Sequence, residues 1–272
     1  MRPCFAGVDS GSWNTKAVVI DDREKVLGKA VVRSGADLAG AALRAFDGAL
    51  DECGVARERV GAVWSTGFGR RNVEFAGGHR TELDCHARGV SHYFDGPLTI
   101  IDVGGQDAKV IRLDETGRRV FHKMNRKCAA GTGSFLEEIA MRLGTDIGEL
   151  PRLASGFTEE IELGSFCTVF TGTELLAEIR RGRQPSDLAR AAYRSLAKRV
   201  IEMDVFEGKV VATGGVVTYH PMVVELLQQI AGCEVIMPPH PQEMGAFGAA
   251  LAARQLAAGV EPGAGSGARG TA

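Results

Sequence analysis

Two cysteines stand where the chain could hold a metal cluster. Cys128 precedes a Gly- and Thr-rich turn at 129–134. Cys167 precedes a hydroxyl-rich turn at 168–174. Each turn is expected to start a helix, whose unpaired N–H groups and partial positive charge favour thiolates and a net-negative cluster held by thiolates. An iron–sulfur cluster usually needs four cysteines, so two per chain predict a symmetric dimer whose subunits supply two each.

An internal repeat is the second feature with chemical meaning. Residues 9–20 and 102–111 each begin with an aspartate at a strand end, turn through glycine and return as a β-branched strand. A polar turn and a further strand follow in both copies, at 26–32 and at 120–124. Two hairpin modules of one pattern predict two similar lobes that face one cleft.

The two turns have the composition of phosphate-binding turns. Glycine lets backbone N–H groups approach a polyphosphate, hydroxyl side chains add donors, and a lysine neutralises charge. Asp9 and Asp102, at the strand ends, are expected to hold a hydrated magnesium ion, and Gln106 is expected to orient the attacking water. The candidate phosphate contacts are Ser12, Trp13, Asn14, Thr15, Lys16, Gly104 and Gly105.

A third glycine turn follows an expected strand at 209–212. Its two glycines would let a flat purine or its ribose lie against bare backbone, where side chains would block the approach. The sequence therefore predicts an adenosine site after this strand. The candidate nucleotide contacts in this region are Gly214, Gly215, Val216, Thr218 and Gln242.

The composition bounds the class of protein. The chain has 272 residues, of which 44% are hydrophobic and 24% charged, enough for one large or two modest globular domains. A net charge of −2 gives no support for a nucleic-acid or membrane-surface partner. The N-terminus runs into a strand, and no apolar stretch approaches the roughly 20 residues of a membrane span, so we expect a cytoplasmic protein. Six cysteines in such a chain indicate reduced thiols or metal ligands. Four of them are interpreted as packing residues: Cys4, Cys53, Cys85 and Cys233.

Three helices are expected near these sites. Residues 134–143 carry apolar side chains on one stripe, which predicts an amphipathic helix just beyond Cys128. Thr171 and Glu174 have the spacing of a capping box, which predicts a helix that begins there. The Ala-rich segment 243–256 is expected to form a helix whose two glycines suit close packing.

The three turns, in this order, resemble the two phosphate motifs and the adenosine motif of the actin, sugar kinase and heat-shock ATPase superfamily. The cysteine segments narrow the resemblance to the ATPase activators of 2-hydroxyacyl-CoA dehydratases and the related ATP-binding subunits of benzoyl-CoA reductase. The resemblance extends from about Phe5 to Ala257. The motifs that carry it are Ser65-Thr66-Gly67-Phe68-Gly69-Arg70, Asp102-Val103-Gly104-Gly105-Gln106-Asp107, Cys128-Ala129-Ala130-Gly131-Thr132-Gly133, Cys167-Thr168-Val169-Phe170 and Thr213-Gly214-Gly215-Val216.

The resemblance implies an α/β protein with a two-lobed, actin-like (ribonuclease H-like) ATPase fold, in which duplicated mixed sheets are flanked by helices. The first lobe would span 1–94 and be completed by the helix at 243–257. The second lobe would span 95–242 and contain the second phosphate turn, the cysteines and the adenosine turn. Residues 258–272 are rich in Gly and Ala and are expected to form a disordered tail.

The resemblance also implies an activity. A homodimer would hold one 4Fe-4S cluster through Cys128 and Cys167 of each subunit, and each subunit would bind one ATP with Mg²⁺ between its lobes. Nucleotide-driven closure would move the helices that point at the cluster. The reduced cluster would pass one low-potential electron to an iron–sulfur acyl-CoA dehydratase or reductase, after receiving it from a ferredoxin or flavodoxin. A heteromer with a sister subunit is the alternative assembly.

Two residues need comment against this resemblance. Trp13 places a bulky ring in the first phosphate turn, where small residues are usual. His86 lies in a segment, 84–87, that family members share, and we interpret it as a hydrogen-bonded core histidine.

Two other functions remain open from the sequence. A small-molecule kinase of the same superfamily, such as an N-acetylsugar kinase, would need a substrate base and would not need cysteines at two helix starts. A regulatory ATPase would bind a partner without any cluster. Cys128→Ser separates these hypotheses, because only the cluster protein should lose a cofactor.

Overall fold

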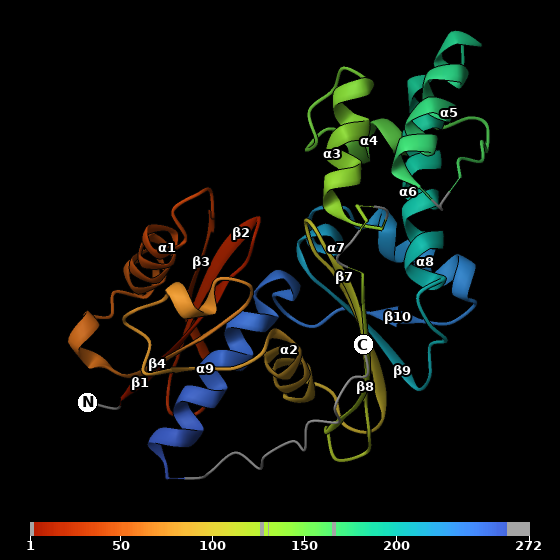
Figure 1. Ribbon diagram of the computed structural model, residues 1–272. Coiled ribbons are helices and arrows are strands. Elements are labelled where there is room, and N and C mark those ends of the chain that lie inside the picture. Colours follow the sequence, from red (N-terminus) through yellow and green to blue (C-terminus); the bar gives the residue numbers. More distant parts are fainter. Residues whose placement is uncertain (1–2, 126–127, 130, 165–166, 260–272) are drawn as a thin grey trace. The chain divides into compact units, whose positions relative to one another are not determined.

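The computed structural model describes residues 3–125, 128–129, 131–164 and 167–259. The chain falls into two compact units (Figure 1). Unit 1 comprises Met1–Gly96, Leu113–Val120 and Glu243–Ala272, and unit 2 comprises Pro97–Arg112 and Phe121–Gln242.

Unit 1 is built on a five-stranded sheet with the strand order β3-β2-β1-β4-β5. Its strands are β1 (Cys4–Ser10), β2 (Asn14–Ile20), β3 (Val26–Arg33), β4 (Val60–Thr66) and β5 (Gly78–His79). β2 runs antiparallel to β1 and β3, whereas β4 runs parallel to β1 and β5. The register of the first hairpin places Lys16 directly opposite Asp9.

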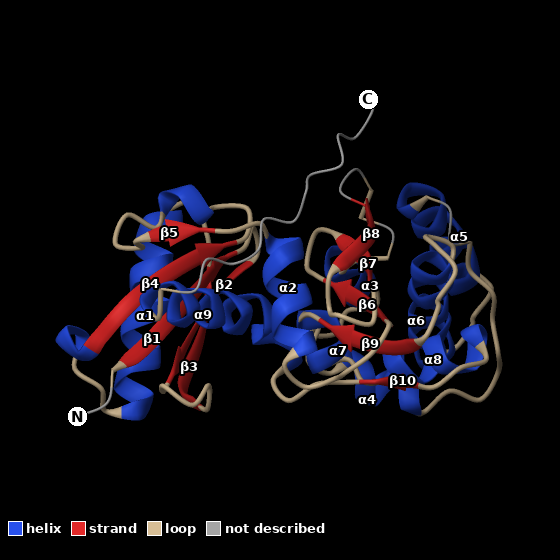
Figure 2. Ribbon diagram, turned by 90° about the horizontal axis from the view of Figure 1, so that it is seen from below, coloured by secondary structure: helices blue, strands red, loops and turns tan. Residues whose placement is uncertain are grey.

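Helices cover both faces of the unit 1 sheet (Figure 2). They are α1 (Leu38–Cys53), α2 (Glu82–Ser91) and α9 (Met244–Ala257), with short 3-10 helices at Arg57–Arg59 and Arg70–Asn72. Successive residues of β1 point to opposite faces of the sheet. Ala6 and Val8 pack into the core with α1 on one face, and Gly7 lies against α9 on the other. A Cβ at Gly7 would stand 2.0 Å from the carbonyl oxygen of Ala246. α2 in turn packs against α9.

Unit 2 repeats the same sheet. Its five strands have the order β10-β9-β6-β7-β8, with β6 parallel to β9 and β9 parallel to β10. Read from β8 to β10, the strands of unit 2 follow the order third, second, first, fourth and fifth along the chain. The sheet of unit 1, read from β3 to β5, has the same order. The expected duplication of mixed sheets flanked by helices is therefore confirmed. The strands are β6 (Leu98–Val103), β7 (Ala108–Leu113), β8 (Arg119–Asn125), β9 (Lys209–Thr213) and β10 (Val235–Ile236).

The core of unit 2 lies between this sheet and a group of helices (Figure 1). The helices are α3 (Gly133–Arg142), α4 (Leu150–Ser155), α5 (Thr168–Arg180), α6 (Pro185–Ile201), α7 (Gly215–Tyr219) and α8 (Met222–Ala231). Apolar side chains of β6 and β9 pack with α3, α6 and α8, including Ile101, Val103, Val210, Phe135, Ile139, Leu196 and Leu226. In the part of the chain that the structure describes, no helix has the length and apolar character needed to cross a bilayer.

The duplication extends to hydrogen bonds in the turns that follow each hairpin. Asp21 and Asp114, at the same distance along the chain from Asp9 and Asp102, each accept hydrogen bonds from the backbone N–H groups two and four residues further on. These carboxylates fix the two turns in the same way, as aspartate side chains commonly do. The repeat seen in the sequence is thus a repeat of individual contacts.

The units differ from the expected division over one segment. Leu113–Val120, which joins β7 to β8, groups with unit 1. Gly117 in this turn packs against the end of α2, where a Cβ would stand 2.9 Å from the Ser91 Oγ. The rest of the expected division stays a prediction, and residues 260–272 of the expected tail lie outside the described residues.

Helix α5 begins one turn earlier than the expected capping box. The N–H of Thr171 already donates to the carbonyl of Cys167 at 2.9 Å, so Thr171 lies inside the helix. The Glu174 carboxylate accepts from the N–H of Gly164 at 2.7 Å instead of capping its own helix. The predicted capping box was wrong, because the Glu174 side chain accepts a hydrogen bond from the loop that precedes the helix.

The chain passes from unit 2 to unit 1 between Gln242 and Glu243, within a 3-10 helix at Pro241–Glu243. Glu243 is buried, and its carboxylate pairs with the Lys29 Nζ of β3 at 3.1 Å. This ion pair fixes the point at which the chain returns to unit 1.

A buried polar pair lies in the core of unit 2. The Tyr193 hydroxyl and His220 Nδ1 share a hydrogen bond of 2.7 Å, and both side chains are buried. Burial lowers the pKa of His220 to about 4 and raises the pKa of Tyr193. His220 is therefore neutral in the folded protein at neutral pH.

The stability of unit 2 should fall in mild acid because of His220. Its folded pKa lies below the ordinary value of 6.5, so the unfolded chain binds the proton first as the pH falls. The free energy of unfolding should be insensitive to this group above pH 6.5 and decrease below it, by about 2 kcal/mol between roughly pH 7 and pH 5. Urea denaturation across this range measures the slope. His220→Gln should flatten it and the exposed-site control His79→Gln should not; an unchanged slope in His220→Gln would contradict the assignment.

Candidate functional site

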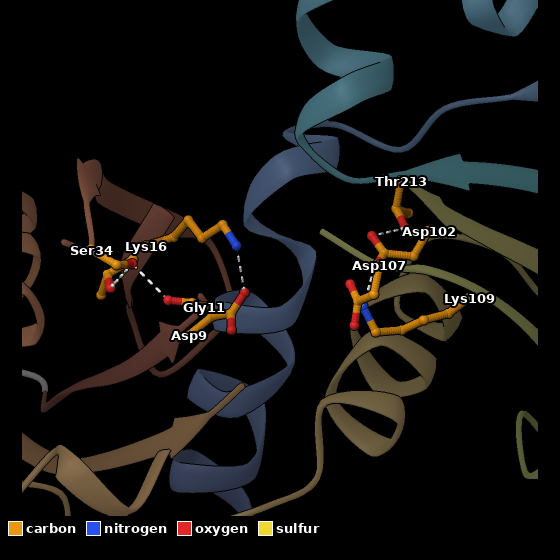
Figure 3. Close-up of polar contacts among 9 residues, drawn as sticks. Asp9, Gly11, Lys16, Ser34, Asp102, Asp107, Lys109 and Thr213 are labelled. Atoms are coloured by element: carbon orange, nitrogen blue, oxygen red, sulfur yellow. Dashed lines mark hydrogen bonds and ion pairs between the residues drawn. The ribbon is translucent and has the colours of Figure 1, made fainter. Parts of the chain in front are cut away.

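Asp9 ends β1 with its carboxylate paired to a lysine. The Lys16 Nζ, across the hairpin on β2, donates to Asp9 Oδ2 at 2.9 Å (Figure 3). Asp9 is buried and Lys16 is half-buried. The first expected phosphate turn therefore has a carboxylate and an ammonium group in contact at its base.

The turn itself is held by Ser34, which the sequence did not single out. The Ser34 hydroxyl donates to the carbonyl of Gly11 at 2.6 Å and shares a 2.9 Å hydrogen bond with the hydroxyl of Thr15 (Figure 3). Thr15 is fully buried, and its side chain supports the turn. The Trp13 ring lies under the guanidinium of Arg33, 4.9 Å from ring centroid to Cζ.

Asp102 ends β6 in the equivalent position of unit 2. The Lys109 Nζ donates to Asp102 Oδ2 at 3.0 Å and to Asp107 Oδ1 at 2.8 Å (Figure 3). The hydroxyl of Thr213, at the end of β9, donates to Asp102 Oδ1 at 3.2 Å. Asp102 and Lys109 are each only 4% exposed. Gln106 is exposed in the same turn.

The two aspartates have the same partner type at the same spacing. In each unit the lysine follows its aspartate by seven residues. Only Lys16 was given a role from the sequence, and Lys109 was missed. Its signal was present in the equal spacing of the two copies.

The adenosine turn requires glycine at its first position. Gly214 has φ of 101°, in the left-handed region, and a Cβ there would stand 2.4 Å from the Val103 carbonyl oxygen. Its N–H donates to the carbonyl of Pro241 at 2.9 Å. Thr218 is exposed, and its hydroxyl donates to the carbonyl of Gly214 at 2.9 Å. The end of β9 thus lies close against β6 and the 3-10 turn that contains Gln242.

Gln242 presents a buried donor beside this turn. It is 3% exposed, and its Oε1 accepts from the Tyr219 hydroxyl at 2.9 Å. Its Nε2 lies 3.3 Å from where a Gly215 Cβ would stand and has no hydrogen-bond partner among the described residues. An unsatisfied buried amide N–H costs about 1–3 kcal/mol, so a ligand with an acceptor here would relieve that cost. These residues therefore fit a purine nucleotide.

Helix α3 begins in contact with both unit 2 turns. The N–H groups of Gly133 and Ser134 donate to the carbonyls of Gly104 and Gly105 at 2.9 and 2.8 Å. A Cβ at Gly133 would stand 3.1 Å from Val216 Cγ2 in the adenosine turn. The first turn of α3 is therefore capped by the expected phosphate turn itself.

One of the two candidate cluster cysteines lies at a helix start, and the other lies in the segment that leads to a helix. Cys128 precedes α3, and its carbonyl accepts from the Asn125 side-chain amide at 3.0 Å. Cys167 is the N-cap residue of α5. Both are half-buried, and neither forms a disulfide within the described residues. Residues 126, 127, 130, 165 and 166 of these segments lie outside the described residues.

The cysteines fit a cluster that needs further ligands from elsewhere. Within the described residues, no group of three or more His, Cys, Asp and Glu side chains could hold a metal ion. Cysteine thiolates are the ligands that iron–sulfur clusters take. The donor set of one chain is therefore half of what a four-cysteine cluster takes.

Helix α5, which begins directly after Cys167, exposes apolar side chains. Val169 and Phe170, on the first turn of α5, are 71% and 67% exposed, and Met141 at the end of α3 is 74% exposed. Leu176 and Ile179 continue the exposed apolar residues along α5. Large apolar side chains gathered on an exposed surface are typical of protein–protein contacts.

The duplicated five-stranded sheets, each with an aspartate at the end of its first strand, define a two-lobed, actin-like α/β ATPase fold. The chain belongs to the BadF/BadG/BcrA/BcrD ATPase family, whose model matches residues 6–253. The resemblance drawn from the turns and cysteines is confirmed.

Named relatives are similar over nearly their whole length. The chain is 37% identical over 248 residues to the 2-hydroxyisocaproyl-CoA dehydratase activator of Clostridioides difficile, covering 90% of this chain and 92% of that protein. It is 36% identical over 256 residues to the (R)-2-hydroxyglutaryl-CoA dehydratase activating ATPase of Acidaminococcus fermentans, covering 93% and 97%. The solved structure of the activator of the 2-hydroxyisocaproyl-CoA dehydratase from Clostridium difficile, with bound ADPNP, has a TM-score of 0.88 at 35% identity and covers 94% of this chain and 96% of that chain.

Removing Lys109 should destabilise the protein more than removing Lys16. The side chains of Lys109 and Asp102 are each 5% exposed, whereas those of Lys16 and Asp9 are 17% and 8% exposed. Lys109→Met would leave the buried Asp102 carboxylate without this cation, although the hydrogen bond from Thr213 would remain. We expect a cost of about 3 kcal/mol for Lys109→Met and about 1 kcal/mol for Lys16→Met. Urea unfolding of nucleotide-free protein measures both.

Lys198→Met is the control, because its partner Glu162 is 74% exposed and surface pairs contribute little. Equal losses in Lys109→Met and Lys198→Met would show that the buried pair is not a stabilising contact.

Proposed function

We propose that this protein is an ATP-hydrolysing electron-transfer activator. It would inject one low-potential electron into a partner 2-hydroxyacyl-CoA dehydratase or benzoyl-CoA reductase-type enzyme, through a 4Fe-4S cluster shared between two subunits. The observation that carries the proposal is the start of α3, whose first N–H groups bond to Gly104 and Gly105 just beyond Cys128. These hydrogen bonds support a link between the proposed phosphate turn and the helix that follows Cys128.

The nucleotide residues have separate roles in this proposal. Asp9 and Asp102 would hold Mg²⁺ through its waters, and Gln106, exposed beside Asp102, would orient the attacking water. Bound Mg²⁺ would neutralise phosphate charge. The phosphates would be held by Ser12, Trp13, Asn14, Thr15, Lys16, Gly104 and Gly105. The adenosine would be held by Gly214, Gly215, Val216, Thr218 and Gln242.

Cys128 and Cys167 would hold the cluster. Cys167 is the N-cap residue of α5, and Cys128 lies five residues before the first residue of α3. A 4Fe-4S cluster supplies one-electron chemistry at a potential set by its surroundings. Two cysteines per chain support a cluster completed by a second subunit.

The apolar surface of α5 supports the same assembly. Val169 and Phe170 follow Cys167 directly and are largely exposed. A second copy of the chain would bury them and bring two more cysteines, so a homodimer is the proposed form. A sister subunit in a heteromer would bury the same apolar side chains.

ATP would act on the cluster through α3. A change at the phosphate turn reaches the helix through the Gly104 and Gly105 carbonyls, and a change at the adenosine turn reaches it through Val216, which lies beside Gly133. Rigid helices convert small shifts at one end into displacement along their length. Hydrolysis and release would then reset the helix.

The partners follow from the relatives. Proteins named as activators of 2-hydroxyacyl-CoA dehydratases share over a third of their residues with this chain, which supports a dehydratase-type iron–sulfur partner. The proposed electron donor is a ferredoxin or flavodoxin, and the proposed location is the cytoplasm. A small-molecule kinase of the N-acetylsugar type, without a cluster, is the less supported alternative.

Anaerobically purified protein should contain iron and acid-labile sulfide. We expect about two irons per chain, because one four-iron cluster would be shared by two subunits. Cys128→Ser and Cys167→Ser should each lose the iron and the visible absorption of the cluster. Cys233→Ser is the matched control and should keep both, since Cys233 packs against the core of unit 2.

Wild-type protein that hydrolyses ATP but contains no iron under strict anaerobiosis would overturn the proposal. A screen for a phosphoryl acceptor would then test the kinase alternative.

A further inference from the structure

Asp9 and His86 both present a polar atom to the same glycine of α9. Gly245 on α9 has no side chain, and its Cβ would stand 3.1 Å from Asp9 Oδ2 and 3.2 Å from His86 Nε2. The Asp9 carboxylate and the His86 imidazole therefore both lie next to the backbone of Gly245, which has no side chain to separate them. All three residues belong to unit 1.

Close helix packing brings His86 to this place. A Cβ at Gly248 would stand 1.9 Å from the Cys85 carbonyl oxygen, and a Cβ at Gly89 would stand 2.6 Å from that of Met244. α2 and α9 can approach this closely because both positions are glycine. With the two helices this close, His86, which is 5% exposed, has its Nε2 beside Gly245.

The neighbouring thiol does not compete for this role. Burial raises the pKa of Cys85 to about 12, so the thiol stays protonated and uncharged. Of these two side chains, the imidazole of His86 is the one whose Nε2 lies beside Gly245. A histidine that only filled space in the core would not require glycine at position 245, next to Asp9.

We infer that His86 is a positioning residue for Asp9. Its Nε2 sets the orientation of the Asp9 carboxylate toward the hydrated magnesium ion, while Lys16 holds the same carboxylate from β2. Polar contacts strengthen where water is excluded, so a second contact at this buried carboxylate restricts its rotation. The inference rests on the proposed function, since it takes Asp9 to serve magnesium.

The two ring nitrogens allow a matched test. The side-chain amide of glutamine reaches about as far as Nε2, and that of asparagine about as far as Nδ1. His86→Asn should lower kcat for ATP hydrolysis about ten- to a hundredfold at saturating Mg²⁺, with KM for ATP changed less than about threefold. His86→Gln should restore most of kcat.

A binding measurement gives a second readout. Calorimetric titration of ADP at increasing Mg²⁺ reports how much the metal strengthens nucleotide binding, independently of turnover. His86→Asn should raise the Mg²⁺ concentration needed for half of this effect about tenfold, and His86→Gln should return it toward the wild-type value. ADP binding without Mg²⁺ should be unchanged in both.

Two further variants support the test. His92→Asn is the control, because His92 lies just beyond α2 with its Nδ1 3.2 Å from Glu24, and it should match the wild type in both readouts. Gly245→Ala would place a methyl group between Asp9 and His86 and should reproduce the defect of His86→Asn. It decides the question if His86→Asn does not fold.

The outcomes separate this inference from the proposed function. Wild-type protein without Mg²⁺-dependent nucleotide binding would overturn the proposed function and the inference with it. Normal wild-type binding, with His86→Asn and Gly245→Ala unchanged in kcat and Mg²⁺ requirement, would overturn the inference alone. Equal loss of thermal stability in the asparagine and glutamine variants, without a changed Mg²⁺ requirement, would make His86 a core histidine and also overturn it.

Discussion

A buried carboxylate facing a lysine across a hairpin is the contact on which each unit depends. Asp9 and Asp102 end the first strand of their sheets, and the antiparallel return strand brings Lys16 and Lys109 opposite them. A carboxylate could not be buried at these positions without a cation or several hydrogen bonds, because isolated charge is costly away from water. The hairpin register, the glycine turns and the polar supports around them all preserve this pairing. In unit 2, Thr213 adds a third side chain and ties β9 to the same carboxylate.

The start of α3 shows how one set of backbone groups can serve two needs. A helix leaves its first N–H groups without partners, and they are usually met by a side-chain cap, water or a ligand. Here the carbonyls of Gly104 and Gly105 take that role for Gly133 and Ser134. The glycine turn thereby keeps its N–H groups for other partners while its carbonyls secure the helix. Because no side chain intervenes, the turn and the helix cannot shift independently without breaking hydrogen bonds.

The repeat in the sequence was sufficient to predict the duplicated sheets, the two hairpins and the glycine turn after β9, because these depend on local patterns of strand and turn residues. The contacts missed were those between distant residues. Ser34 supports the first turn from the residue just beyond β3, and nothing near it in sequence marks that role. The start of α5 was misplaced because Glu174 bonds to Gly164, across a loop that local spacing does not describe. The orientation of Gln242 likewise depends on Tyr219, in a different helix.

The chain's return at Gln242 and Glu243 has a consequence for how this protein can vary in evolution. Gln242 is fixed against α7 and the glycine turn after β9, and Glu243 is fixed to Lys29. The two anchors are consecutive residues, so a single peptide bond separates them, and the backbone offers only two soft dihedrals per residue to absorb a mismatch. An insertion or deletion here would break one anchor or the other. This crossing should therefore tolerate substitution but not a change of length, unlike an ordinary linker between two compact parts.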